Sequence, residues 1–433
     1  MSGPFPQLPV KRVATVTLGK MLQPSASSFD DVLMPYLRAA HIQPGGRILE
    51  LEEQPMWFSR SERRSLQLSS EDVVVVEGGA GYGRSARILQ DRPGWGFQNS
   101  ILRVRRIPEL SIGAFIYYAF QAALDSGQIA VVCNTATFAH FTAEKVAALE
   151  IPAPSLARQR AVVSFLDRET AEIDAFIADQ EELIGLLAER RAATISHAVT
   201  KGLDPTVPMK DSGVEWLGEV NADWSITRLK NIAEILPGFA FSSDSFSETS
   251  DAIPLLRGIN VGVGKIDWKE TVSWDRAVDA GLETYLLREG DIVVGLDRPI
   301  ISGGVRVARV GKADAPSLLV QRVARIRAIG ANSASFIEYL MGAQAFADYL
   351  SPLFTGVSVP HISPSQVGDF GIAVPLPEVQ ARVVRQLDFE VSEIDEAISD
   401  AKEAIVLSRE RRAALISAAV TGKIDVREHE AVA

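Results

Sequence analysis

The sequence is poor in the features that mark secreted, membrane-bound or metal-clustered proteins. It has one cysteine, Cys133, in 433 residues, so neither an intrachain disulfide nor a thiolate zinc cluster can form. No run reaches the roughly 18 uncharged apolar residues of a membrane span. Residues 1–12 also lack the apolar core of a signal peptide. We therefore expect a cytoplasmic protein without a membrane partner.

Motifs for catalysis are missing as well. The five histidines include no H-x-x-x-H or H-E-x-x-H pair, which argues against a metal site. No G-x-S-x-G elbow, Walker loop or paired-carboxylate signature is visible, and Cys133 has no evident catalytic partner. A nuclease or methyltransferase that acts on its own therefore ranks below the binding functions.

An internal duplication organises the chain. Residues 154–200 align without a gap on residues 375–421, and 25 of the 47 positions are identical. Fainter matches upstream are His140 with His361, Asp72 with Asp291, and Gln98 with Gln321. The chain therefore alternates variable and constant segments, and we expect the domain boundaries 1–153, 154–204, 205–374 and 375–433.

Each constant segment predicts one long helix. Each runs about 45 residues without an internal proline and ends near Gly202 or Gly422, which are helix stop signals. Heptads counted from Val163 and from Val384 give six and eight apolar residues at ten a and d positions. A helix about 70 Å long needs a partner.

That partner is either the surface of the helix's own domain or, as we favour, the other copy. An antiparallel coiled coil of the two copies would hold two similar domains apart at a fixed distance. The residues expected to pair are Leu166, Ile173, Ile177 and Ile184 with Leu387, Ile394, Ile398 and Ile405.

The variable segments predict α+β domains. β-branched runs at residues 72–76 and 291–294 are each followed by a glycine-rich loop with arginines, and helix-like stretches follow at 112–125 and 334–350. The loop at residues 78–84 is rich in glycine but lacks the spacing of a dinucleotide fingerprint. A loop that presents backbone N–H groups and arginine to an anionic backbone fits these residues better.

Three stretches, at residues 166–174, 210–220 and 355–363, stand out within this order of variable and constant segments. Together with that order they resemble the DNA specificity subunit of type I restriction-modification systems, and the resemblance covers nearly the whole chain. It implies a non-catalytic subunit whose two target recognition domains each read one half of a split site in double-stranded DNA. The long helices would be the spacer between the halves and the docking surface for two methylation subunits.

By the same resemblance, the chemistry lies in the partners. S-adenosylmethionine, ATP and Mg²⁺ are expected in the methylation and restriction subunits, and no cofactor in this chain. The chain accordingly lacks both the Asn/Asp-Pro-Pro-Phe/Tyr tetrapeptide of adenine methyltransferases and a helicase P-loop.

The net charge of −11, from 44 basic and 55 acidic residues, argues against DNA unless basic residues gather locally. Alternating arginines such as Arg103 and Arg105 point to one face of a strand, which is either a solvated face or a DNA-binding face. In the first domain the DNA-contact candidates are Gly81, Tyr82, Arg84, Arg87, Gln98, Asn99, Arg103, Arg105 and His140. Those in the second are Arg298, Ser302, Gly303, Arg306, Gln321, Arg322, Thr355, Ser358 and His361.

A different class of function stays open at this point. The coiled coil could assemble a scaffold whose two variable domains bind peptides. The equivalent positions of His140 and His361 also fit a purely structural role. The shared glycine and arginine loops of the two variable domains favour the DNA hypothesis.

Overall fold

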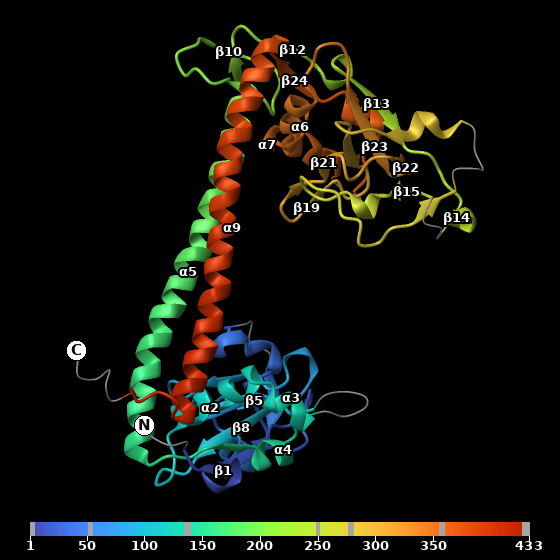
Figure 1. Cartoon of the computed structure of the whole chain (residues 1–433). Coiled ribbons are helices and arrows are strands. Elements are labelled where there is room, and N and C mark those ends of the chain that lie inside the picture. Colours follow the sequence, from blue (N-terminus) through green and yellow to red (C-terminus); the bar gives the residue numbers. More distant parts are fainter. Residues whose placement is uncertain are drawn as a thin grey trace. The chain divides into compact units, whose positions relative to one another are not determined.

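The computed structural model describes residues 5–50, 55–133, 140–247, 252–275, 281–354 and 360–426. The chain forms two compact units, residues 1–181 with 402–433, and residues 182–401. Each unit contains one domain of mixed strands and helices and a section of both long helices (Figure 1), which confirms the predicted α+β class. Within the described ranges no helix has the length and apolarity needed to cross a bilayer.

The two predicted long helices are α5 (Leu156–Thr200) and α9 (Pro377–Thr421), each of 45 residues. Between residues 171 and 194 of α5, every side chain that is not exposed occupies a predicted a or d position. All ten predicted a and d positions of α9, from Val384 to Leu415, are buried or half-buried. The heptad pattern therefore marks the buried seam of both helices.

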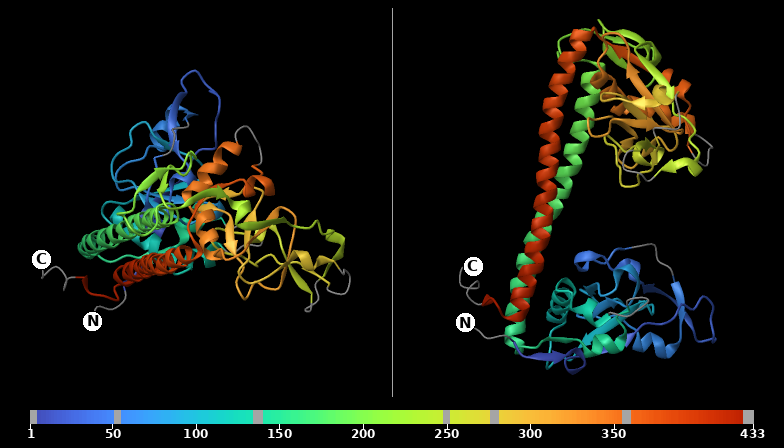
Figure 2. Two further views of the ribbon diagram at one scale, coloured as in Figure 1. Left: turned by 90° about the horizontal axis from the view of Figure 1, so that it is seen from above. Right: turned by 45° about the vertical axis from the view of Figure 1, so that its right-hand side comes forward.

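Ion pairs fix the direction of the helix pair in each unit. In the first unit Arg412 Nε donates to Asp174 Oδ1 at 2.9 Å, and in the second Arg191 Nε donates to Asp395 Oδ1 at 2.8 Å. The duplication exchanges these two contacts, because Asp174 aligns with Asp395 and Arg191 with Arg412. The predicted antiparallel coiled coil is confirmed, and α5 and α9 run side by side in each unit (Figure 2).

The same ion pairs correct part of the predicted register. The pair of Asp174 with Arg412 puts Ile173 opposite the end of α9 in the first unit, and the pair of Arg191 with Asp395 puts Ile394 opposite the end of α5 in the second. Ile173 and Ile394 therefore do not pack against the isoleucines proposed for them. The predicted pairing of Leu166 with Leu387 is wrong as well, because Leu166 shares a core with Ile416 and Leu387 shares one with Ile195. Heptad spacing predicts which side chains of each helix are buried, but not how far one helix is shifted along the other. The charged residues beside the buried positions select that shift.

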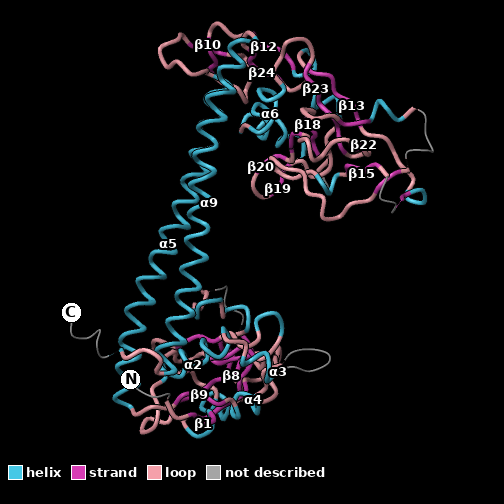
Figure 3. The backbone as a smooth tube through the Cα atoms, in the orientation of Figure 1, coloured by secondary structure: helices cyan, strands magenta, loops and turns pink. Residues whose placement is uncertain are grey.

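The strands of the first domain, drawn in magenta in Figure 3, form two sheets and one further pair. A four-stranded antiparallel sheet has the order β2-β8-β5-β6, a three-stranded sheet the order β4-β3-β7, and β1 pairs with β9. The strands are β1 (Gln7–Pro9), β2 (Ala14–Leu18), β3 (Val32–Leu37), β4 (Pro55–Phe58), β5 (Val73–Val76), β6 (Ser85–Arg87), β7 (Gly96–Phe97), β8 (Ile101–Arg106) and β9 (Glu150–Pro152). The shorter helices are α1 (Arg60–Ser65), α2 (Gly113–Asp125), α3 (Gln128–Cys133) and α4 (Ala143–Ala148).

The run of four valines in β5 is buried on both faces of the four-stranded sheet. Val73 and Val75 face a core shared with α2 and the long helices, whereas Val74 and Val76 face the core beneath the three-stranded sheet. A strand covered on both sides needs apolar residues at every position rather than at alternate ones. The continuous β-branched run is thus explained by the second layer.

The second domain repeats this plan with a larger outer sheet. A four-stranded sheet has the order β13-β23-β18-β21, a five-stranded sheet the order β14-β16-β15-β22-β17, and β10-β11, β12-β24 and β19-β20 form pairs. The strands are β10 (Met209–Asp211), β11 (Glu219–Asn221), β12 (Ser225–Arg228), β13 (Ala233–Pro237), β14 (Phe246–Ser247), β15 (Ile253–Leu256), β16 (Ser273–Trp274), β17 (Leu286–Leu287), β18 (Ile292–Gly295), β19 (Ile300–Ile301), β20 (Gly304–Val305), β21 (Val307–Arg309), β22 (Ser317–Leu319), β23 (Val323–Ala328) and β24 (Gly371–Val374).

The helix expected over residues 334–350 is interrupted. It forms α6 (Ala334–Gly342) and α7 (Gln344–Leu350), and α8 (Pro364–Gly368) follows later. Ala343 between them has an extended backbone, with φ −76° and ψ 157°, and its side chain is buried. The break lets Phe336, Met341 and Phe346 enter one core with the ends of the long helices.

A buried glutamine near the start of each long helix joins that helix to its own domain. In the second unit Gln380 accepts a hydrogen bond from Ser333 N at 2.8 Å and donates to Asn332 Oδ1 and Pro375 O at 3.0 Å. Gln159, its equivalent in the first unit, accepts from Ile112 N at 2.9 Å. The repeated contact holds each helix in one orientation on its domain.

Replacing Gln380 with Leu should lower the free energy of unfolding by about 2–6 kcal/mol. The change leaves the Ser333 N–H and the Pro375 carbonyl without their partner in a buried site, and each unmet group costs about 1–3 kcal/mol. The matched control is Gln386→Ala, because Gln386 is exposed and, among the residues described, its side chain bonds only that of Glu390. We expect a change within about 0.5 kcal/mol there. Equal effects in chemical denaturation would contradict this role for Gln380.

Candidate nucleic-acid interface

In each domain, five residues gather where the end of one central strand lies beside the start of its neighbour. We call this group the strand-end cluster. In the second domain it consists of Asp297, Arg298, Gln321, Arg322 and His361, at the end of β18 and the start of β23. In the first domain it consists of Gly78, Gly79, Asn99, Ser100 and His140, at the end of β5 and the start of β8.

Two backbone contacts of the cluster recur in both domains. Leu296 N donates to Arg322 O at 2.9 Å, and Glu77 N donates in the same way to Ser100 O at 3.0 Å. A β-bridge joins Asp297 to His361 and, correspondingly, Gly78 to His140. The predicted equivalence of the two histidines therefore has a structural basis.

The hydrogen bonds correct one of the predicted equivalences. Gln321 N donates to Phe239 O, and the matching bond in the first domain runs from Asn99 N to Lys20 O, both at 2.8 Å. Gln321 therefore corresponds to Asn99 and not to Gln98. The loops before β8 and β23, residues 98–100 and 320–322, have the same length, which makes Asn99 and Gln321 equivalent positions. Identity of residue type alone aligned them one position out of register.

The side chains of the two clusters differ. Arg322 Nη1 donates to both oxygens of the Asp297 carboxylate, at 3.0 and 3.1 Å, and His361 Nδ1 lies 2.6 Å from Oδ1. Burial alone would raise the pKa of Asp297, but the hydrogen bonds from His361 and Arg322 and the charge of Arg322 outweigh it and lower the pKa. The carboxylate therefore stays ionised at neutral pH.

Two residues of the second cluster have a strained backbone. Arg298 has φ 45° and Arg322 has φ 70°, a region that L-residues other than glycine rarely adopt, and the position of Arg298 is held by Gly79 in the first domain. Such a conformation costs about 1–2 kcal/mol per residue. An exposed ion pair such as that between Arg322 and Asp297 contributes only about 0–1 kcal/mol. The arrangement is therefore not explained by stability, and strain of this kind gathers at functional sites.

A third arginine of the second domain, Arg306, binds backbone carbonyls of the cluster and of a neighbouring loop. Arg306 donates to Val261 O at 2.9 Å and to Asp297 O at 2.8 Å, and it also bonds Gly258 O. Its equivalent by backbone hydrogen bonding is Arg84, since Gly295 N donates to Arg306 O as Val76 N donates to Arg84 O. Arg306 thus holds backbone in place, and it was predicted instead as a DNA contact.

The alternating arginines of β8 do not form a DNA-binding face. Arg103 is 5% exposed and donates to the carbonyls of Ser65 and Gln67, while Arg105 holds the buried Asp72 carboxylate with two bonds of 2.7 Å. In β23 Arg325 is buried in the same way and Arg327 binds Asp291. The prediction for Arg103 is wrong because the segment around residue 67 covers that face of the strand.

The remaining candidates are spread around the two domains. Arg87 forms an ion pair of 3.5 Å with Asp167, and Gly81 lies in the turn that Tyr82 N closes onto Gly79 O. Ser302 and Gly303 are exposed in the turn between β19 and β20. Thr355 and Ser358 lie outside the described residues.

Asp297 is the site residue that the sequence did not reveal. The duplication equates it with Gly78, so the alignment places a charged residue against one without a side chain. A Cβ on Gly78 would lie 2.7 Å from His140 Nδ1, so a side chain there would displace the histidine. In the sequence, Asp297 is marked by its position shortly after a β-branched run, where the other repeat has a glycine.

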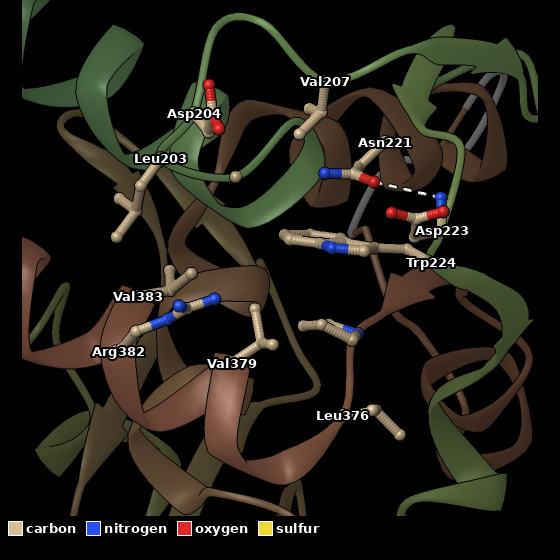
Figure 4. A pocket seen from close by; sticks show the side chains of 12 residues that line it. Leu203, Asp204, Val207, Asn221, Asp223, Trp224, Leu376, Val379, Arg382 and Val383 are labelled. Atoms are coloured by element: carbon tan, nitrogen blue, oxygen red, sulfur yellow. Dashed lines mark hydrogen bonds between the residues drawn. The ribbon is translucent and has the colours of Figure 1, made fainter.

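A cavity of about 500 Å³ lies elsewhere in the second unit, between the end of α5 and the start of α9 (Figure 4). The Trp224 ring forms one wall, Val379 and Val383 another, and Asp223 N donates to Asn221 Oδ1 at 3.0 Å beside it. None of its lining residues belongs to the strand-end cluster. Within the described ranges, no group of His, Cys, Asp and Glu side chains could hold a metal ion.

Comparison with known proteins gives a consistent group of relatives, although no family model matches the chain. The chain is 33% identical over 209 residues to the EcoAI type I restriction enzyme specificity subunit of Escherichia coli, a match covering 48% of this chain and 34% of that protein. It is 29% identical over 283 residues to the MjaVIII specificity subunit of Methanocaldococcus jannaschii, covering 64% and 63%. The chain thus spans less than two thirds of the length of either relative.

A solved structure extends the likeness over the whole fold. A chain from a study of complex assembly in a type I R-M system matches with a TM-score of 0.68 and 15% identity, covering 98% of this chain and 99% of that one. At this identity the match concerns the fold. It includes both domains and both long helices of the present chain.

Proposed function

The chain is a relative of the specificity subunits of type I restriction enzymes, and from this premise we propose that it gives such a complex its DNA sequence specificity. In this proposal each recognition domain reads one half of a bipartite target in double-stranded DNA. The long helices dock two methylation subunits and, through them, the restriction subunits. S-adenosylmethionine, ATP and Mg²⁺ act in those partners, and this chain is not catalytic.

The observation that carries the proposal is the duplicated strand-end cluster. Its backbone hydrogen bonds repeat between the domains, while its side chains change from Gly78, Asn99 and Ser100 to Asp297, Gln321 and Arg322. Base edges are distinguished by their hydrogen-bond donors and acceptors. Two domains that recognise different base sequences therefore need different polar side chains on a shared backbone arrangement.

The helices support the docking of two partner copies. In the first unit a groove of about 510 Å³ between α5 and α9 is lined by residues that include Glu172, Phe176 and Leu407. Leu407 and its equivalent Leu186 on α5 in the second unit are each 57% exposed. Equivalent apolar side chains left in solvent on both repeats fit two copies of one partner, since exposed apolar patches mark interaction sites.

A coiled-coil scaffold that binds peptides is the second candidate. It accounts for the exposed leucines on the helices but not for the strained arginines of the second cluster. DNA binding falls steeply with salt because phosphate contacts release counterions. A gel shift at rising salt with the methylation subunit present therefore separates the two functions, and binding to mixed DNA that does not change with salt would favour the scaffold.

Exchanging residues 1–153 for the equivalent domain of a relative should change one half of the methylated sequence. The other half and the gap should stay the same, because distant sites act independently. Mapping adenine methylation in cells that carry the hybrid subunit and its methyltransferase gives the measurement. A hybrid in which both halves change would contradict one reader per domain, and methylation unrelated to sequence would contradict the proposed function.

A further inference from the structure

The carboxylate of Asp297 sets the second strand-end cluster apart from the first. It lies between Arg322 and His361, and the Arg322 side chain is 60% exposed. Only Nη1 of Arg322 is engaged by the carboxylate. Among the described residues, Nη2 and Nε have no hydrogen-bond partner, so one edge of a fixed guanidinium faces outward.

We propose that Arg322 reads a guanine in the DNA half-site of the second domain and that Asp297 is its positioning residue. This inference rests on the proposed function and names the base that the site takes. Guanine presents O6 and N7 in the major groove as two neighbouring acceptors, which match two donors of one guanidinium. Because the ion pair with Asp297 already restricts the Arg322 side chain, the guanidinium loses little further rotational freedom when it binds these two acceptors.

The neighbouring carboxylate distinguishes a base from a phosphate as the ligand. Asp297 carries a negative charge 3.0 Å from Nη1 and is partly exposed, so it repels a phosphate placed against the same arginine. The edge of a base pair is neutral, and a carboxylate can accept a hydrogen bond from the cytosine amino group. A G·C pair therefore suits both members of the ion pair, whereas a phosphate suits only one.

The neighbouring residues fit the same use. Gln321 is exposed beside Arg322, and an amide side chain can pair with adenine. Gly78 and Ser100 take the places of Asp297 and Arg322 in the first domain, which therefore lacks this reader. The two half-sites should accordingly differ at this position.

The test measures discrimination at every base pair of both half-sites. The full chain in complex with its methyltransferase is given targets in which each base pair is replaced in turn, and Kd and methylation rate are recorded for wild type, Arg322→Ala, Arg322→Lys and Asp297→Asn. Preference for one G·C pair in the second half-site should fall from about 5- to 150-fold, the range for a bidentate contact, to near unity in the alanine variant. The first half-site should be read as before, which also shows that the variant is folded.

Asn99→Ala is the matched control in the first domain, and it should alter reading in the first half-site only. Asp297→Asn keeps the size of the side chain, removes its charge and should weaken discrimination at the same G·C pair. Uniform weakening on all targets in Arg322→Ala, with the salt slope smaller by about one unit, would identify a phosphate contact and overturn the inference. Unchanged discrimination in every variant would overturn it too. A wild-type complex that discriminates no sequence would instead contradict the proposed function.

Discussion

Inserting one heptad into both α5 and α9 should abolish methylation of the original target. Seven residues lengthen each helix by about 10 Å, or roughly three base pairs. Three base pairs also turn the DNA by about 110°, since one turn takes 10–10.5 base pairs. The second half-site would then be at the wrong distance and would face the wrong way. We expect methylation of the original target to disappear from a map of methylated adenines in cells that carry the variant.

Three heptads in both helices should restore methylation on a new target. The added length of roughly 31 Å corresponds to about nine base pairs and nearly one turn of DNA. We expect the same two half-sites with a gap longer by that amount. The insertions belong after Glu181 in α5 and after Ala401 in α9, where one compact unit ends and the other begins.

A heptad in α5 alone is the control for the insertions. It cannot keep both the pair of Asp174 with Arg412 and the pair of Arg191 with Asp395, so the seam must slip in one unit. This variant should lose stability as well as methylation. If the paired insertions leave the gap unchanged, the helices are not the spacer.

Replacing Ile405 with Asp should lower the free energy of unfolding by about 3–5 kcal/mol. Ile405 is 6% exposed at a seam position of α9, and a carboxylate there loses its hydration without gaining a partner. At roughly 2–4 °C per kcal/mol, the melting temperature should fall by roughly 6–20 °C. Differential scanning calorimetry of the full chain gives the measurement.

The next residue in the chain supplies the matched control. Val406 is 52% exposed, so Val406→Asp adds the same charge to the same turn of helix without burying it. We expect a change within about 0.5 kcal/mol. Similar losses in the two variants would mean that charge on α9, and not the apolar seam, governs stability.

The long helices were predictable from the sequence because their signal is local and repeated. The heptad pattern gave the buried positions of α5 and α9, and the duplication gave their equivalence. The β-branched runs likewise predicted the central strands β5 and β18. In these cases the residues of a segment determine its own structure.

Features that depend on distant segments escaped the sequence analysis. Alternation in β8 placed Arg103 and Arg105 on one face, but it could not tell that the segment around residue 67 covers that face. The interaction of Asp297 with Arg322 joins two loops that the pairing of β18 with β23 brings together. Residue identity aligned Gln98 with Gln321, whereas the backbone hydrogen bond of Gln321 is repeated by Asn99, a contact with a distant strand that the sequence does not show.

The first unit is built from the beginning and the end of the chain, which has a consequence for its synthesis on the ribosome. Its core joins Val162, Phe165 and Leu166 of α5 to Ile416 and Val420 of α9, about 250 residues later in the chain. At 5–20 residues per second, the nascent first domain waits roughly 12–50 s for that apolar cover. During this time the seam of α5 is open to any apolar surface, including the same segment on a neighbouring nascent chain. The first unit therefore completes its core only when translation reaches the end of α9.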